Sequence, residues 1–227
     1  ELRMRATLAM IEGRREDAVA HNARSFEIER RTGSRTAESS FFGMTAWLLK
    51  DWEELGQLEP WFDNTRHAYF DWADRPMEVM RQCVLHEVGR TAELRERFET
   101  LAAEGFAEAP RDQQWMTFMA EMSRLCASLA DRTRAAELLE LFESFSGDHV
   151  VETQLGVYGG PVDGYLGLLC ELLGQTDAAV TYLEAARLQS ERAGAVVYRV
   201  RAEADLARVL HARGSSADRA QALDLAQ

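Results

Sequence analysis

Residues 165–186 read YLGLLCELLGQTDAAVTYLEAA. The stretch contains an apolar segment with helical periodicity, a short turn at Gly174, and a second amphipathic segment that includes Leu183 and Ala186. Two helices joined by such a short turn pack against each other as an antiparallel pair. The stretch therefore predicts a helical hairpin, a unit that recurs along the chain in helical-repeat proteins.

Similar hairpins recur along the chain with a period of about 40 residues. Their turns are expected near Gly13, Lys50, Gly89, Ala130, Gly174 and Gly214. Seven residues before each turn, five of the six positions carry a small residue; the six are Ala6, Gly43, Gln82, Ser123, Gly167 and Ala207. A small residue here lets the second helix of a pair approach the first closely. Five residues after the turn, the first five units are apolar, at Ala18, Leu55, Leu94, Ala135 and Ala179.

This pattern resembles the tetratricopeptide repeat. We therefore predict an all-α fold, a tetratricopeptide-like right-handed superhelix of antiparallel helix pairs (an α-solenoid), with no strand. Residues 1–227 would form a single array of about five complete pairs and a partial sixth. The chain starts at Glu1 and stops at Gln227 inside an expected helix, so we expect it to be part of a larger protein.

One unit departs from the pattern, because Gly56 and Pro60 follow the turn near Lys50. A proline inside a helix costs roughly 3 kcal/mol. The second helix of this unit should therefore either kink, or begin nearer Leu58 with Pro60 in its first turn.

Composition narrows the function. The 26 basic and 38 acidic residues give a net charge of −12, which disfavours direct binding to nucleic acid or to an anionic membrane. No uncharged apolar stretch is long enough to span a bilayer. The three cysteines, Cys83, Cys126 and Cys170, fit neither a disulfide framework nor zinc-ligand spacing, so we expect a cytoplasmic protein. They are interpreted as small buried side chains, with a redox sensor as the alternative.

Motifs for catalysis are missing from the sequence. There is no glycine-rich nucleotide-binding motif, and the only lysine, Lys50, lies in no phosphate-binding context. The segment from His86 to Arg90 begins like a zinc-protease helix but has arginine where the second histidine must stand. We therefore expect no enzyme activity, no cofactor and no metal.

A closer resemblance involves residues 105–214. It is carried by the segments Gly105-Phe106, Pro110-Arg111-Asp112, Ala130-Asp131-Arg132, Gly159-Gly160-Pro161-Val162-Asp163, Gly194-Ala195 and Asp205-Leu206-Ala207. These resemble the degenerate tetratricopeptide-like region of large bacterial, mainly actinobacterial, signal-transduction ATPases that carry a LuxR-type DNA-binding domain or a nucleotide cyclase. The resemblance implies a protein-interaction and sensing module within a transcriptional regulator. Its partner would be a protein or peptide, including neighbouring modules of the parent chain.

In such superhelices the first helix of each pair lines a concave groove. Three residues before the turns that face would carry Trp47, His86, Ala127, Glu171 and His211, and six before them Met44, Cys83, Arg124, Leu168 and Arg208. We predict partner binding at Trp47, His86, Glu171, Arg208 and His211, with the Trp47 ring as the anchor. The alternative is that these are ordinary exposed residues, and that the repeats are a passive scaffold packed on an ATPase module.

An aromatic cluster supplies a third hypothesis. Nine of the 20 aromatic residues lie within residues 41–72: Phe41, Phe42, Trp47, Trp52, Trp61, Phe62, Tyr69, Phe70 and Trp72. They either fill a poorly matched helix pair or line a pocket for a small molecule. Farther along, Tyr158-Gly159-Gly160-Pro161 predicts a turn, with Pro161 at the first position of the next helix.

Overall fold

A computed structural model describes residues 1–34, 36–64, 74–103, 105–152 and 155–225 of the chain. Helices dominate this described part. In chain order the elements are α1 (Leu2–Ile11), α2 (Arg15–Arg31), α3 (Ala37–Asp51), the 3-10 helix η1 (Leu55–Leu58), α4 (Glu59–Asn64), α5 (Asp74–Glu87), α6 (Thr91–Ala102), η2 (Phe106–Glu108), α7 (Trp115–Leu129), α8 (Arg132–Phe142), η3 (Glu143–Phe145), β1 (His149–Glu152), β2 (Val157–Pro161), α9 (Val162–Leu173), α10 (Thr176–Arg192), α11 (Val196–Arg213) and α12 (Ser216–Leu225).

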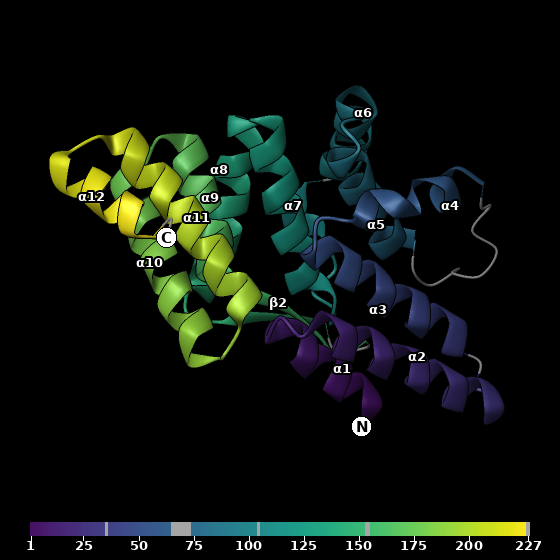
Figure 1. Cartoon of the computed structure of the whole chain (residues 1–227). Helices are drawn as coiled ribbons and strands as arrows, with labels where there is room; N and C mark the ends of the chain where they lie inside the picture. Colours follow the sequence, from purple (N-terminus) through teal and green to yellow (C-terminus); the bar gives the residue numbers. More distant parts are fainter. Residues whose placement is uncertain (35, 65–73, 104, 153–154, 226–227) are drawn as a thin grey trace.

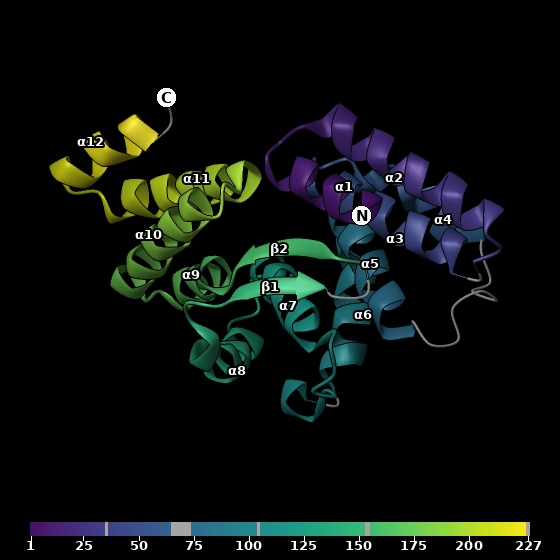
Figure 2. The same ribbon diagram turned by 90° about the horizontal axis from the view of Figure 1, so that it is seen from below.

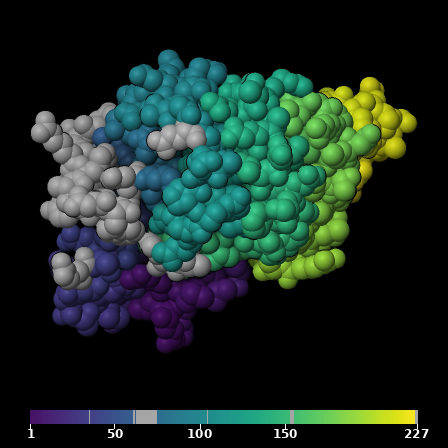
Figure 3. Space-filling view, turned by 180° about the vertical axis from the view of Figure 1, so that it is seen from behind, coloured from purple at the N-terminus to yellow at the C-terminus, as the bar shows by residue number. Residues whose placement is uncertain are grey.

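Consecutive helices pack against one another as pairs. α1 packs on α2, α5 on α6, α7 on α8, α9 on α10 and α11 on α12, while α7 joins α5 to α9 and α11 rests on α10. Figure 1 shows the pairs following one another from α1 and α2 to α12, and the surface in Figure 3 keeps the same order. The predicted all-α class is confirmed for most of the described residues. Within them, no helix has the length and apolar character that crossing a membrane requires.

Each of six turns contains a residue in the left-handed backbone conformation that ends a helix. The six are Gly13, Glu53, Gly89, Ala130, Gly174 and Gly214, with φ between 55° and 81°. Five stand where turns were predicted. The prediction of a turn near Lys50 is wrong, because Lys50 lies in the last turn of α3 and the chain turns at Glu53.

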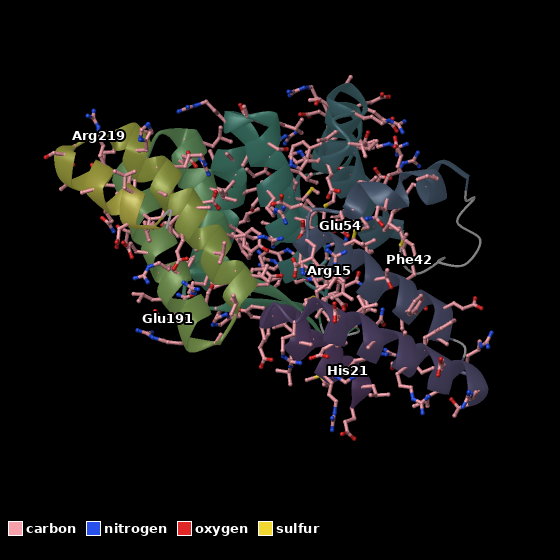
Figure 4. The ribbon with its side chains drawn as sticks, in the orientation of Figure 1. Arg15, His21, Phe42, Glu54, Glu191 and Arg219 are labelled. Carbon is pink, nitrogen blue, oxygen red and sulfur yellow. The ribbon has the colours of Figure 1, made fainter. Side chains whose placement is uncertain are left out.

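Two contacts explain this displacement. The Lys50 side chain is only 4% exposed and is paired inside the molecule, which requires α3 to continue through it. Beyond the turn, the Arg15 guanidinium of α2 donates two hydrogen bonds, of 2.6 and 2.5 Å, to the Glu54 carboxylate. Arg15, which Figure 4 labels near Glu54, also lies 4.7 Å from the centre of the Trp52 ring. The turn is therefore held by charged side chains on both of its flanks.

The prediction that the fold has no strand is also wrong. β1 and β2 form an antiparallel hairpin, with a register shift between Val150 and Val151. Tyr158 to Pro161, predicted as a turn, belong to β2, and Pro161 precedes the first residue of α9. The valines of both strands favour extended backbone, and Val150 and Val157 are fully buried. The hairpin crosses from α9 towards α1 and α3 (Figure 2).

The irregular unit follows the second of its two predicted forms. After α3 the chain forms η1, and α4 begins at Glu59 with Pro60 in its first turn. Proline is tolerated there because the first turn of a helix has no acceptors for its backbone N–H groups. Within the described residues, η1 and Glu59–Asn64 stand where the other units have their second helix.

The helices α9 and α10 approach each other closely at Gly167. A Cβ placed on Gly167 would lie 2.6 Å from Cγ of Leu183 and 3.5 Å from the carbonyl oxygen of Ala179. Glycine therefore permits this packing, as the column of small residues predicts. The largest buried cluster runs from α3 through α9 and includes Phe98, Phe106 and Phe142.

Candidate functional site

Two adjoining pockets lie on the side of the molecule lined by the first helices of the pairs. The α5–α7 pocket has a volume of about 360 Å³, and its lining includes Lys50, His86 and Glu121. The α9–α11 pocket has a volume of about 300 Å³, and its lining includes Tyr165 and Arg201. Both are lined by Glu53 and Arg124. We refer to the two pockets together as the inner groove.

Arg124 stands on α7 at the junction of the two pockets, and its side chain is partly buried. Within the described ranges its guanidinium makes no hydrogen bond and no ion pair. Burial alone would lower the pKa of Arg124. Nearby negative charges, of which that of Glu121 is the most important, outweigh burial and raise the pKa above its ordinary value. The side chain is therefore a permanent positive charge whose five N–H donors are available.

Glu121 does not bond Arg124, because its two oxygens are engaged elsewhere. One forms a buried ion pair with the Lys50 ammonium, and the other lies 3.5 Å from the Cys83 thiol. Lys50 also lies 3.7 Å from the centre of the Trp47 ring. Burial would raise the pKa of Glu121, but the charges of Lys50 and Arg124 outweigh burial and lower it. The wall of the α5–α7 pocket is thus internally paired.

A second polar cluster joins α3 to α11. Arg201 donates a hydrogen bond of 3.0 Å to the buried Asp51 carboxylate, and others of 2.9 and 3.3 Å to the backbone carbonyls of Asp51 and Lys50. These carbonyls belong to the last turn of α3, where a cation is favoured. The cluster links helices separated by about 150 residues, whereas a repeat in a solenoid contacts only its neighbours. Arg201 also lines the α9–α11 pocket.

The β-hairpin also contacts both α3 and α11. The Tyr158 carbonyl oxygen accepts a hydrogen bond of 3.1 Å from the Trp47 indole N–H, and the Tyr198 hydroxyl lies 2.7 Å from the same oxygen. That hydroxyl is also 3.0 Å from the Asp51 carboxylate, and its single proton serves one acceptor at a time. Gly160 has φ of +91°, and a Cβ on it would lie 2.3 Å from the Tyr198 ring. The hairpin backbone is therefore tightly enclosed between α3 and α11.

The expectation that Trp47 offers its ring to a partner is wrong. The ring is 3% exposed, with its face covered by Lys50 and its N–H bonded within the chain. His86, in contrast, is exposed and lines the α5–α7 pocket. Although the residue as a whole is exposed, partial burial of its imidazole is the first cause that lowers the pKa of His86, and the positive charge of Arg124 is the second. The imidazole is therefore neutral at neutral pH.

The other three predicted residues lie on α9 and α11. Glu171 and Arg208 form an ion pair, and Arg208 also bonds Asp205, which lines the α9–α11 pocket. His211 is exposed and lines neither pocket. The structure thus groups Glu171 with Arg208 beside the inner groove and leaves His211 outside it.

Sequence reasoning left Glu53, Asp51, Tyr198 and Arg201 out of the site. Their positions depend on the contact between α3 and α11, which no local pattern encodes. Arg124 did carry a signal, because it occupies the inner-face position six residues before the turn at Ala130. That signal is weak because the neighbouring positions of that unit are apolar or small.

The described side chains of the aromatic cluster make separate contacts. Phe41 stacks on Phe26 of α2 with ring centres 4.7 Å apart, and Phe42 makes an edge contact with Phe62. Beside them is an apolar cavity of about 120 Å³, lined by Phe42, Trp47, Met77, Met80, Phe118 and Leu155 among others. Tyr69, Phe70 and Trp72 lie outside the described residues.

The inner groove offers side chains that can donate and accept hydrogen bonds. The described residues contain no group of three metal-ligating side chains. Burial raises the pKa of Cys126 to about 12 and that of Cys170 to about 11, and it raises that of Cys83 further, so all three remain thiols. A thiol at neutral pH is a weak nucleophile. The groove offers instead a charged donor at Arg124 and an exposed carboxylate at Glu53.

Comparison with known proteins identifies no relative. No protein-family model, no curated protein and no solved structure matches the chain.

Proposed function

We propose that this chain is a non-catalytic, protein-binding module that holds an extended polypeptide segment in its inner groove. The observation that carries the proposal is the pair of pockets meeting at Arg124, a charged side chain with no partner in the described part of the chain. We further propose that the helix pairs form a tetratricopeptide-like right-handed superhelix whose first helices present this groove.

A polypeptide fits the groove better than a compact ligand does. The lining passes from His86 on α5, over Arg124 on α7, to Leu168 on α9 and Asp205 on α11. A segment lying across four helices can place successive side chains in successive pockets. Its walls are fixed before binding by the ion pairs of Lys50 and Asp51, which lowers the entropy cost of binding.

The biological context follows from the resemblance of residues 105–214. The module would act inside a cytoplasmic bacterial signalling protein, where the bound segment biases a neighbouring ATPase or DNA-binding module between two states. The net charge of −12 supports a protein partner and opposes direct nucleic-acid binding by this module.

A second candidate is a small-molecule sensor. The apolar cavity of about 120 Å³ beside Phe42 is close in size to cavities that bind benzene. A small monocyclic aromatic compound would raise the thermal midpoint of unfolding if it bound there. Met80→Trp would fill the cavity and remove that response, while leaving the inner groove unchanged.

A groove-blocking substitution tests the leading proposal. Peptides are selected from a random display library on the purified chain, and their dissociation constants are measured. Ala204 is exposed and lines the α9–α11 pocket, so Ala204→Trp should weaken binding by about tenfold or more. Ala20→Trp, at an exposed position of α2, is the matched control and should bind normally. Equal binding by both variants would place the peptide elsewhere and overturn the assignment.

A further inference from the structure

We propose that the inner groove selects a segment that carries an acidic and a basic side chain a few residues apart, the acidic one pairing with Arg124 and the basic one with Glu53. This inference rests on the proposed function and specifies the chemistry of its ligand. It makes Arg124 and Glu53 the determinants of specificity.

The acidic position follows from the state of Arg124. The cations that border the groove are otherwise engaged: Lys50 with Glu121, Arg201 with Asp51, and Arg208 with Glu171 and Asp205. Among the described residues, Arg124 alone of these four cations has no ion pair. Glu121 stabilises the charge of Arg124, but within the described residues the N–H groups of Arg124 have no hydrogen-bond acceptor, and a planar guanidinium binds a carboxylate through two parallel hydrogen bonds. An incoming Asp or Glu side chain would supply these acceptors.

The same surroundings favour a carboxylate over a phosphate. Glu53 and Glu121 line the pockets that meet at Arg124, and Asp205 lines one of them. The attraction to Arg124 grows in proportion to the charge of the ligand, whereas the cost of moving an ion out of water grows with the square of its charge. A dianion is therefore penalised more than a carboxylate at this partly buried position.

The basic position follows from Glu53. Its side chain is exposed at the left-handed turn after α3, where φ is 57°, and it lines both pockets. Within the described ranges its carboxylate has neither a hydrogen-bonding nor an ion-pairing partner. Arg124 and Glu53 therefore present opposite unpaired charges at one junction. An extended segment whose alternate side chains point to the same face can satisfy both.

Peptide titrations test this specificity. The probe is the blocked pentapeptide Ala-Asp-Ala-Lys-Ala, compared with its neutral counterpart Ala-Asn-Ala-Gln-Ala, and the dissociation constants are measured by nuclear magnetic resonance. The charged peptide should bind about tenfold more tightly than the neutral one. Arg124→Gln should abolish that preference, and Glu53→Gln should reduce it only a few-fold, because Glu53 is exposed.

Two controls separate recognition from damage to the fold. Arg219→Gln changes an exposed arginine of α12, far from both pockets, and should keep the full preference (Figure 4). Arg124→Glu should reverse the selectivity, binding Ala-Lys-Ala-Lys-Ala more tightly than the wild-type chain does. If Arg124→Gln does not fold, the peptide pair measured on the wild-type chain still decides the question.

The outcomes distinguish this inference from the proposed function. If library peptides bind, and Ala204→Trp blocks them, but charged and neutral pentapeptides bind equally, the specificity is wrong and the binding module stands. If inorganic phosphate perturbs the Arg124 side-chain resonance at lower concentration than acetate does, the ligand class is wrong. If no peptide of any kind binds, the proposed function fails and this inference fails with it.

Discussion

Gly167 on α9 and Gly43 on α3 occupy the same predicted position of their units but meet different neighbours. A Cβ on Gly167 would collide with Leu183 of α10, the partner helix of its own pair. A Cβ on Gly43 would lie 2.7 Å from Leu155, in the loop between β1 and β2. The repeated small residue therefore predicts a close contact at its position, but it does not predict which structural element makes that contact.

The difference arises from the element that comes after each helix in the chain. α9 precedes α10, whose 17 residues are long enough to cover it. In the described residues α3 is followed by η1 and by α4, seen from Glu59 to Asn64, and the hairpin and α11 also contact α3. As a result, two charged residues at the end of α3, Lys50 and Asp51, are buried. The regular unit is stabilised by adjacent helices, and the irregular unit by polar contacts from distant ones.

The largest effect is expected at the buried ion pair of the irregular unit. Lys50→Met would leave the Glu121 carboxylate buried without its cation, which should lower the free energy of unfolding by about 3–5 kcal/mol. Urea denaturation at neutral pH measures the loss. Adding Glu121→Leu should recover much of it, because the pair is then replaced by apolar groups. A loss below about 1 kcal/mol in the single variant would show that the pair is hydrated and weak.

The same pair gives a pH dependence. The pKa of Glu121 is lowered in the folded chain, so its contribution to stability is complete above the unfolded value of about 4.3 and is lost as the pH falls through the folded value. In Lys50→Met the carboxyl can become neutral in acid, which removes the cost of an unpaired charge. The stability difference between wild type and Lys50→Met should therefore shrink as the pH falls from neutral into acid, beginning above the unfolded pKa of about 4.3, as measured by urea denaturation across pH. A difference that is constant from neutral pH into acid would contradict this account.

The second effect in size concerns the regular unit. Gly167→Leu should overpack α9 against α10 and destabilise the chain by roughly 1–3 kcal/mol or more, seen as a lower thermal midpoint. The interior of this pair offers little room for adjustment, because Leu183 is fully buried. Wild-type stability in this variant would show that the helices do not meet at Gly167.

Gly43→Ala should have a smaller effect. The colliding atom is the end of the Leu155 side chain, which can rotate away, and alanine is favoured over glycine inside a helix by roughly 0.5–1 kcal/mol. The two effects oppose each other, so the net change should be within about 0.5 kcal/mol. In a Leu155→Ala background the collision is absent, and Gly43→Ala should become stabilising. If it stays neutral there, Leu155 is not the group that approaches Gly43.

Structural features that depend on residues close together in the chain could be predicted from the sequence. The positions of five turns, the close packing at Gly167 and the placement of Pro60 all follow from local rules, and the structure has them. The hairpin, the turn at Glu53 and the burial of Trp47 were missed, because each depends on a contact with α7, α11 or β2. The position of Arg124 in its repeat placed it on the inner face, but only the three-dimensional structure shows that its side chain has no partner among the described residues.

A small effect is also expected at the ion pair of the regular region, Glu171 with Arg208. The Arg208 side chain is 50% exposed and that of Glu171 is 27% exposed, so water screens their attraction. Arg208→Ala should therefore lower the free energy of unfolding by about 0–1 kcal/mol, and a double-mutant cycle with Glu171→Ala should give a coupling energy of the same size. High salt should reduce that coupling, while it should leave the effect of Lys50→Met nearly unchanged. A coupling energy near that expected for the buried pair would mean that α9 and α11, like α3, are held mainly by polar contacts, and the contrast between the two regions would disappear.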